Sequence, residues 1–259
     1  MSGAQGRLPM HETLETFLSG SAERLRRAGI ASSRLDAEVL LAWVLGVGRE
    51  ELYAHPGRPL SAREAAAGRA LIERRARREP VSYLLGRKGF WDLDFFVSPE
   101  VLIPRPETEI LLERFIQTAR SAGTLAPEVL DVGTGSGNIA VVAAREFPES
   151  RVIAVDRSPA ALAVARENVR RHGVAGRVSL VGSDLFSALA QKEFDFILSN
   201  PPYIETEDLP GLMPDVVDYE PALALDGGRE GLDIYRRLVP ARGACAGLRK
   251  SKHPRRCRK

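Results

Sequence analysis

The spacing of hydrophobic residues divides this chain into three stretches. Over residues 11–85 apolar side chains recur every three to four positions, as in Leu14, Phe17 and Leu18, which is the spacing of amphipathic helices. Over residues 86–106 short apolar pieces are interrupted by Asp and Pro, which predicts a β-hairpin or a linker. From residue 107 onward, short apolar runs alternate with helical patterns. That alternation predicts an α/β fold built on parallel strands.

The first stretch is expected to form a small all-α bundle. The run from Arg34 to Leu45 has amphipathic character, and Ser61 followed by Glu64 matches a helix-starting capping box. We expect the aromatic side chains of Trp43 and Tyr53 to lie in the core of this bundle. The bundle offers no visible chemistry, and a domain of this size typically binds a partner or positions a substrate.

Four apolar runs in the last stretch are expected to be buried strands of a doubly wound, Rossmann-like sheet. In such sheets ligands bind at the carboxyl ends of the strands, where the order of the strands reverses. The four runs span residues 129–132, 152–155, 178–181 and 194–198.

Polar or glycine-rich elements follow these expected strands. The first strand runs into Gly133-Thr134-Gly135-Ser136-Gly137, and Asp156 lies roughly 20 residues further on, the place of an acid that binds a ribose diol. The glycine spacing differs from the dinucleotide form, and Asp131 at the end of the first strand suits a nucleoside that carries an amino-acid arm better than a pyrophosphate. In that reading Asp131 would face the amino group, Asp156 the ribose hydroxyls, and Asp184 with Leu185 would flank the adenine. Each acid taken singly could also be an ordinary strand-end residue.

The fourth strand runs into Asn200-Pro201-Pro202-Tyr203. The two prolines restrict the backbone of this turn. The side-chain oxygen of Asn200 and the carbonyl of Pro201 could then accept the two hydrogens of a planar –NH2 group, while the ring of Tyr203 stacks on its face. The alternative is a rigid turn without chemistry.

A proline-rich segment precedes the sheet. Pro104 and Pro106 stiffen it, and a helix is expected to begin near Glu107. Arg105 and Glu107 could face a ligand, or they could be solvated charges of a linker.

The charge balance depends on the last residues. The whole chain carries a net charge of +3 and has a pI near 9.0, but residues 242–259 hold eight Lys and Arg and no acid, which leaves −5 for residues 1–241. The acidic body argues weakly against a nucleic-acid substrate. Both cysteines lie in the same tail, so neither a disulfide framework nor a metal site is expected in the body. No membrane-spanning run or signal peptide is present, and we expect a cytoplasmic protein.

Taken together, the segment Asp131–Gly137, the acids Asp156 and Asp184, and the turn Asn200–Tyr203 resemble class I S-adenosylmethionine-dependent methyltransferases that act on planar amino groups. Further blocks, over residues 11–240, resemble the HemK/PrmC family of peptide chain release factor N5-glutamine methyltransferases. These blocks are Arg34-Leu-Asp-Ala-Glu38, Pro80-Val-Ser-Tyr-Leu-Leu-Gly86, Phe90-Trp91, Leu102-Ile-Pro-Arg-Pro-Glu-Thr-Glu109 and Gly231-Leu-Asp-Ile-Tyr-Arg236.

The resemblance implies methyl transfer from S-adenosylmethionine to the side-chain amide nitrogen of the glutamine in the Gly-Gly-Gln loop of a release factor. It implies catalytic roles for Asn200 and Pro201, which would bind the substrate together with Pro202 and Tyr203. It further implies a monomer with no membrane partner and no nucleic-acid substrate. The implied cofactor-binding residues are Asp131, Gly133, Thr134, Gly135, Ser136, Gly137, Asp156, Asp184, Leu185 and Asn200.

These patterns also predict the domain organisation. A helical substrate-recognition domain is expected over residues 1–85 and a hairpin or linker over 86–106. A methyltransferase domain would follow over residues 107–241, and a basic, disordered tail over 242–259.

The tail departs from the family pattern, in which further strands follow the helix near residues 231–239. The change in charge and cysteine usage indicates a frameshifted or truncated end, with a nucleic-acid-binding tail as the alternative. The shortened sheet would leave the strand at 194–198 as an exposed apolar edge, with marginal stability as the expected result.

Two other functions stay open. The chain could methylate a ribosomal-protein glutamine or a nucleic-acid amine, or it could be an inactive truncated member of the family.

Overall fold

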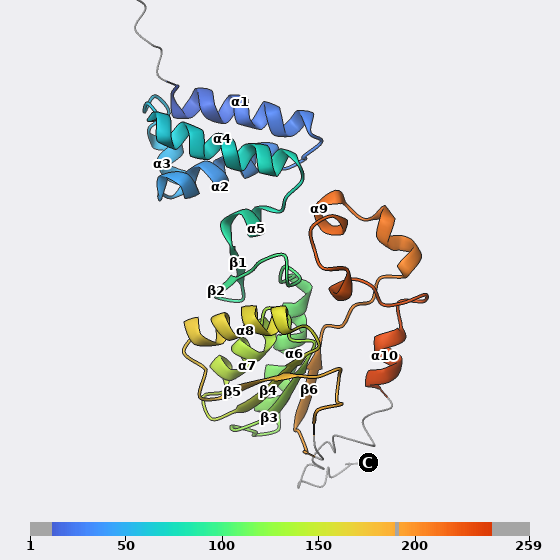
Figure 1. Cartoon of the computed structure of the whole chain (residues 1–259). Helices are drawn as coiled ribbons and strands as arrows, with labels where there is room; N and C mark the ends of the chain where they lie inside the picture. Colours follow the sequence, from blue (N-terminus) through green and yellow to red (C-terminus); the bar gives the residue numbers. More distant parts are fainter. Residues whose placement is uncertain (1–11, 190–191, 240–259) are drawn as a thin grey trace, which may run out of the picture. The chain divides into compact units, whose positions relative to one another are not determined.

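The computed structural model describes residues 12–189 and 192–239 (Figure 1). These residues form two compact units that divide between Leu85 and Gly86. The tail over residues 242–259, with the expectations attached to it, lies outside the described residues.

The first unit is all helical. Its core is formed by buried apolar faces, with Leu14, Leu25, Leu40 and Leu41 almost wholly enclosed. The capping box at Ser61 is present, because Ser61 Oγ accepts from the backbone amide of Glu64 and the Glu64 carboxylate accepts from that of Ser61. The helices are α1 (Leu14–Arg27), α2 (Ser33–Leu45), α3 (Arg49–Ala54), α4 (Ala62–Ala76) and α5 (Val81–Leu85).

The expectation that Trp43 and Tyr53 lie in the core is wrong. Their exposed fractions are 47% and 58%. Tyr53 lies at the surface with its ring exposed, and its hydroxyl donates to the buried carboxylate of Glu38 at 2.6 Å. Helical spacing marks which residues share a face, but α2 is apolar on more than one face and the bundle covers only part of it.

The second unit begins with the expected hairpin, made of β1 (Arg87–Phe90) and β2 (Leu93–Phe96). Helices and strands of an α/β domain follow. They are α6 (Glu107–Ser121), β3 (Glu128–Val132), α7 (Asn138–Glu146), β4 (Arg151–Asp156), α8 (Pro159–Arg171), β5 (Val178–Gly182), β6 (Phe196–Ser199), the 3₁₀ turns η1 (Thr206–Gly211) and η2 (Ala222–Ala224), α9 (Pro214–Val217) and α10 (Asp233–Leu238).

The sheet of this unit is parallel, and its strand order in the described residues is β5-β4-β3-β6. The fold is therefore the Rossmann-like α/β class that the alternating pattern predicts. The chain moves outward from β3 to β5 and then returns to the other side of β3 for β6. The order reverses beside β3, so the carboxyl ends of β3 and β6 flank a switch point, where parallel sheets hold their ligands.

Alternate residues of β3 point to opposite faces of the sheet. Val129 joins the cluster formed by α6, α7 and α8, which lie together in Figure 1. Leu130 and Val132 join a second cluster on the other face, where Phe194 and Leu238 pack. Because the period of a strand is two, Asp131 shares the helix-covered face with Val129.

β6 forms one edge of the sheet in the described residues and pairs only with β3. It begins two residues later than expected, because Phe194 turns into the second core cluster instead of extending the strand. Its side chains are partly covered: the Phe196 ring meets the Phe115 ring edge-on with centroids 5.0 Å apart, and Leu198 is buried, while the other three residues keep intermediate exposure. The edge is therefore open for backbone pairing, while its side chains are partly packed. No helix among residues 12–189 and 192–239 is long and apolar enough to cross a membrane.

Candidate functional site

A cavity of about 220 Å³ lies at the carboxyl ends of the parallel strands. Most of the site residues expected from the sequence line it, although they come from segments far apart in the chain. The register explains this, since parallel strands end at the same edge of the sheet. The expected residues that line the cavity are Gly133, Thr134, Gly135, Ser136, Asp156, Asp184, Leu185, Asn200, Pro201 and Pro202.

A second cavity of about 290 Å³ adjoins the first. Asn200 and Pro201 line both cavities, and so do Arg105 and Thr108. Tyr203 lines only the second cavity and has 61% of its surface exposed. The turn at Asn200 and Pro201 therefore forms part of the wall of both cavities. A group that aligns two reactants would need such a position.

The loop between β3 and α7 depends on glycines with left-handed backbones. Gly133, Gly135 and Gly137 have φ values of 74°, 54° and 81°. A Cβ at Gly133 or Gly135 would meet no protein atom within 4 Å, so the space beside the loop is free for a ligand. A Cβ at Gly137 would lie 3.2 Å from that of Ala165, so this glycine serves the packing of α7 on α8 and does not line the cavity.

Asp156, at the end of β4, supports the loop and faces the cavity. Its Oδ2 accepts from the amide of Gly135 and its Oδ1 from the amide of Ser158, both at 2.9 Å. A carboxylate oxygen has more than one acceptor site, so both oxygens keep capacity for hydroxyl donors of a ligand. The chain thus holds this carboxylate in one orientation before any ligand binds.

Asp131 is fully buried and is not among the residues that line the cavity. Its Oδ2 accepts from the hydroxyl of Thr134 at 2.6 Å, and its Oδ1 has no hydrogen-bond partner in the described residues. Burial raises the pKa of the Asp131 carboxyl to about 7. The hydrogen bond from Thr134 lowers the pKa, and the negative charge of Asp156 raises it by a smaller amount. In this structure Asp131 holds the glycine loop through its hydrogen bond with Thr134. The contact of Asp131 with an amino group of a ligand stays a prediction.

Asp184 and Leu185 lie at the rim of the cavity after β5. Arg237 of α10 donates to Asp184 Oδ2 at 2.7 Å, and this hydrogen bond lowers the pKa of the Asp184 carboxyl. Leu185 has a φ of 54°, a left-handed conformation that costs a side chain on the order of 1–3 kcal/mol. The strained turn places its side chain in the cavity wall, a position that suits an apolar contact with a flat ligand.

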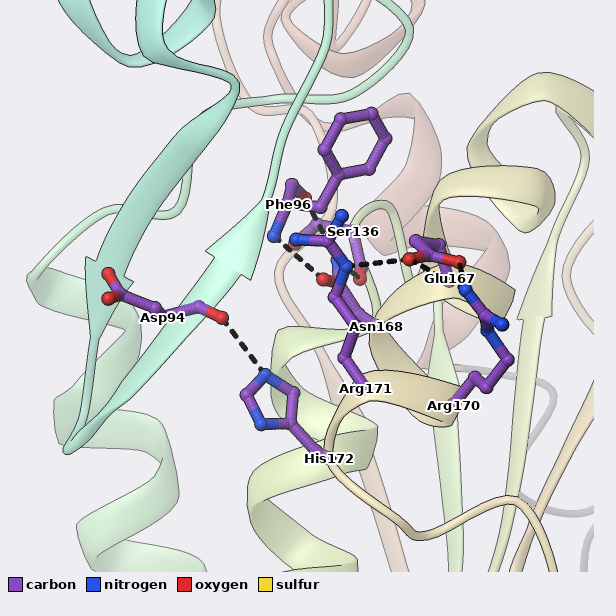
Figure 2. A network of polar contacts seen from close by, with 8 residues as sticks. All are labelled: Asp94, Phe96, Ser136, Glu167, Asn168, Arg170, Arg171 and His172. Carbon is purple, nitrogen blue, oxygen red and sulfur yellow. Dashed lines mark hydrogen bonds and ion pairs between the residues drawn. The ribbon is translucent and has the colours of Figure 1, made fainter. Parts of the chain in front are cut away.

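Asn168 of α8 was not expected as a site residue, yet it ties the glycine loop to the hairpin. Figure 2 shows its side chain between Phe96 and Ser136. Its Nδ2 donates to the carbonyl oxygens of Phe96 (2.9 Å) and Ser136 (2.8 Å), and its Oδ1 accepts from the Phe96 amide (2.7 Å). The sequence held one signal: an Asn on the apolar face of the helix, at helical spacing from Ala161 and Ala165.

Asn200 follows β6 directly. Its Nδ2 donates to the hydroxyl of Thr108 in the first turn of α6, at 3.1 Å. The amide end of the side chain is therefore engaged with α6, and its oxygen remains as the acceptor. The end of β6 is tied to β3 by a hydrogen bond from Ser199 Oγ to the carbonyl of Val132 at 2.7 Å.

Arg105 also reaches both cavities, and a buried acid holds it there. Glu220 is 5% exposed; its Oε1 accepts from Arg105 at 2.5 Å and its Oε2 from the amide of Ile103 at 3.3 Å. Burial raises the pKa of the Glu220 carboxyl, against the charge of Arg105. Glu220 lines neither cavity but holds a residue that lines both, and no pattern in the sequence marked it. Arg105 is therefore paired with a buried carboxylate, and it is not a solvated charge of a linker.

Two family models match the chain. The N-terminal domain of PrmC matches residues 17–86, and the methyltransferase small domain matches residues 106–214. Together they cover the helical unit and most of the α/β unit.

Curated relatives match over nearly the whole described chain. A release factor glutamine methyltransferase of Geobacter sulfurreducens is 46% identical over 88% of this chain and 78% of its own length. The proteins of the same name from Moorella thermoacetica and Caulobacter vibrioides are 45% and 42% identical, over 92% and 88% of this chain and 82% and 78% of theirs. Identity of this extent includes both units and the cavity-lining segments, and the chain therefore belongs to the family of release factor glutamine methyltransferases.

Proposed function

We propose that this chain transfers the methyl group of S-adenosylmethionine to the side-chain amide nitrogen of the glutamine in the Gly-Gly-Gln loop of a peptide chain release factor. One observation carries the proposal beyond family membership: Asn200 and Pro201 line both cavities. The first cavity would hold the methyl donor and the second the acceptor glutamine. Methyl transfer needs the two reactants in line, and the shared turn lies where they would meet.

The residues of the first cavity suit the cofactor. The open space beside Gly133 and Gly135 would admit the amino-acid arm, and the oriented carboxylate of Asp156 would accept the ribose hydroxyls. Asp184, kept ionised by Arg237, would accept from the amino group of adenine, and Leu185 would cover its face. When bound, the cofactor would supply an electrophilic methyl group on a sulfonium. As the new N–C bond forms, the methyl–sulfur bond would break to leave a neutral thioether, and the amide nitrogen would lose one hydrogen as a proton to solvent.

The second cavity suits a primary amide. An amide nitrogen is a poor nucleophile because its lone pair is delocalised into the carbonyl. Asn200 Oδ1 and the Pro201 carbonyl would accept its two hydrogens, hold the amide plane and polarise the N–H bonds. Acceptors at these positions would also stabilise the positive charge that develops on the nitrogen, so most of the rate gain would come from positioning and electrostatics.

The test is methyl transfer from labelled S-adenosylmethionine to a purified release factor. A factor with Gln→Ala in its Gly-Gly-Gln loop is the control for the site of modification. Label on the intact factor alone is the expected result. Equal label on both factors would assign the activity to another residue. Absence of label, together with a melting temperature that rises on adding cofactor, would leave a cofactor-binding protein with a different acceptor.

A further inference from the structure

We propose that Thr108 is a positioning residue for the methyl acceptor, because its hydroxyl anchors the Asn200 carboxamide beside the acceptor cavity. The inference rests on the proposed function for its kinetic consequence. The anchoring contact itself is a property of the free protein.

Thr108 is placed for this role by burial and by its contact. It is 6% exposed, lies in the first turn of α6 and lines both cavities. Its hydroxyl accepts the hydrogen bond from Asn200 Nδ2 at 3.1 Å, and this contact joins residues 92 positions apart in the chain. The backbone amide of Thr108 donates separately to the Arg105 carbonyl at 3.0 Å, so the turn that carries it is held without the side chain.

The orientation of the Asn200 carboxamide matters because its oxygen and its nitrogen form opposite kinds of hydrogen bond. An amide oxygen accepts hydrogen bonds, whereas an amide nitrogen only donates them. A primary amide in the acceptor cavity presents N–H donors to Asn200. If the carboxamide of Asn200 turned over, its own N–H groups would oppose those donors, and the acceptor would be repelled from the reactive position.

Thr108 anchors the far side of the group through one hydrogen bond. Because a hydroxyl can also donate, this bond fixes the position of the carboxamide, and the N–H donors of the acceptor then favour the sense with the oxygen toward them. With Nδ2 engaged by Thr108 Oγ1, Oδ1 is directed away from α6 and remains for the acceptor. The two prolines that follow Asn200 limit movement of its backbone, so rotation of the side chain is the freedom left to control. A residue outside the Asn-Pro-Pro-Tyr motif thereby holds the carboxamide of the motif in place.

The test compares Thr108→Val with Thr108→Ser. Valine has nearly the shape of threonine and lacks the hydroxyl, and serine keeps the hydroxyl. We expect Thr108→Val to lower kcat roughly tenfold, the worth of about one hydrogen bond, with an unchanged Kd for S-adenosylmethionine. Thr108→Ser should keep kcat near the wild-type value. Thr118→Val, which removes an exposed hydroxyl from the same helix, is the matched control.

A measurement on the free protein separates this inference from the proposed function. The side-chain amide signal of Asn200 in ¹⁵N NMR can be assigned by its absence in Asn200→Asp. We expect its protons to exchange slowly with water in the wild type and faster in Thr108→Val; if that variant melts early, Thr108→Ala provides the comparison. Fast exchange in the wild type, or kcat within twofold of wild type in Thr108→Val, would overturn the inference. A wild type that shows the slow exchange but methylates no release factor would refute the proposed function alone.

Discussion

The side chain of Asn168 donates a hydrogen bond to the carbonyl oxygen of Ser136 at 2.8 Å. Through this contact α8 holds the glycine loop that forms one wall of the first cavity. The same side chain also donates to the carbonyl of Phe96 and accepts from its amide (Figure 2). Asn168 has no exposed surface. A buried amide therefore joins both the loop and the hairpin to α8.

Replacing Asn168 by alanine should destabilise the α/β unit by roughly 3 kcal/mol, because each lost hydrogen bond contributes about 1 kcal/mol and buried backbone groups are left without partners. The affinity for S-adenosylmethionine should fall as well, since Ser136 loses its anchor. Urea denaturation and calorimetric titration measure the two effects. Gln117→Ala, an exposed amide on α6, is the control. A stability within 0.5 kcal/mol of the wild type, roughly the range of surface substitutions, would contradict the anchoring role.

Gly137→Ala should destabilise the protein by roughly 1–3 kcal/mol, because overpacking adds to backbone strain. The new Cβ would lie 3.2 Å from the Cβ of Ala165 and 3.3 Å from its Cα. Gly123→Ala is the matched control, since Gly123 also has a left-handed φ, of 69°, but nothing within 4 Å of the added Cβ. The difference in melting temperature between the two variants reports the clash alone. Equal losses would show that backbone strain accounts for the whole effect.

Asp131 should make stability depend on pH. Its pKa is raised by burial from 3.8 to about 7 in the folded protein, so the folded state keeps a proton that the unfolded chain has already lost. Between about pH 4 and pH 7 the unfolded state therefore binds fewer protons, and the free energy of unfolding falls as the pH rises. Asp131→Asn cannot ionise and should remove this fall, so the variant gains stability over the wild type as the pH increases.

Denaturation curves from pH 4 to pH 8 check the Asp131 prediction. Asp208→Asn, which alters an exposed carboxylate in η1, should follow the wild-type profile. If Asp131→Asn and the wild type keep a constant difference across the range, the carboxyl does not titrate there.

Asn200→Ala should abolish turnover far more than it weakens cofactor binding. Loss of a group that stabilises charge in the transition state typically lowers kcat on the order of 100-fold or more. The Kd for S-adenosylmethionine should change little, because the first cavity keeps Asp156, Asp184 and the glycine loop. Single-turnover methylation and calorimetry measure the two quantities. A loss confined to cofactor affinity would remove Asn200 from the methyl-transfer step.

Much of the site could be predicted because it depends on local chemistry. A glycine-rich turn after an apolar run, Asp156 at the end of the next strand and the Asn-Pro-Pro-Tyr turn each mark their place through backbone conformation and spacing, which neighbouring residues determine. The hairpin and the capping box at Ser61 were predictable for the same reason. The expected burial of Trp43 and Tyr53 was wrong because burial depends on what the rest of the unit covers.

The sequence by itself determined the α/β class, the parallel strands and the set of residues that end them, since periodicity and turn chemistry act over a few positions. Only the tertiary structure decided how distant side chains meet: Asn168 with Ser136, Thr108 with Asn200, and Glu220 with Arg105. It also buried Asp131 completely and left it out of the cavity lining. The physical reason is that these contacts join segments from 32 to 115 residues apart, and they exist only once the sheet and its helices have packed.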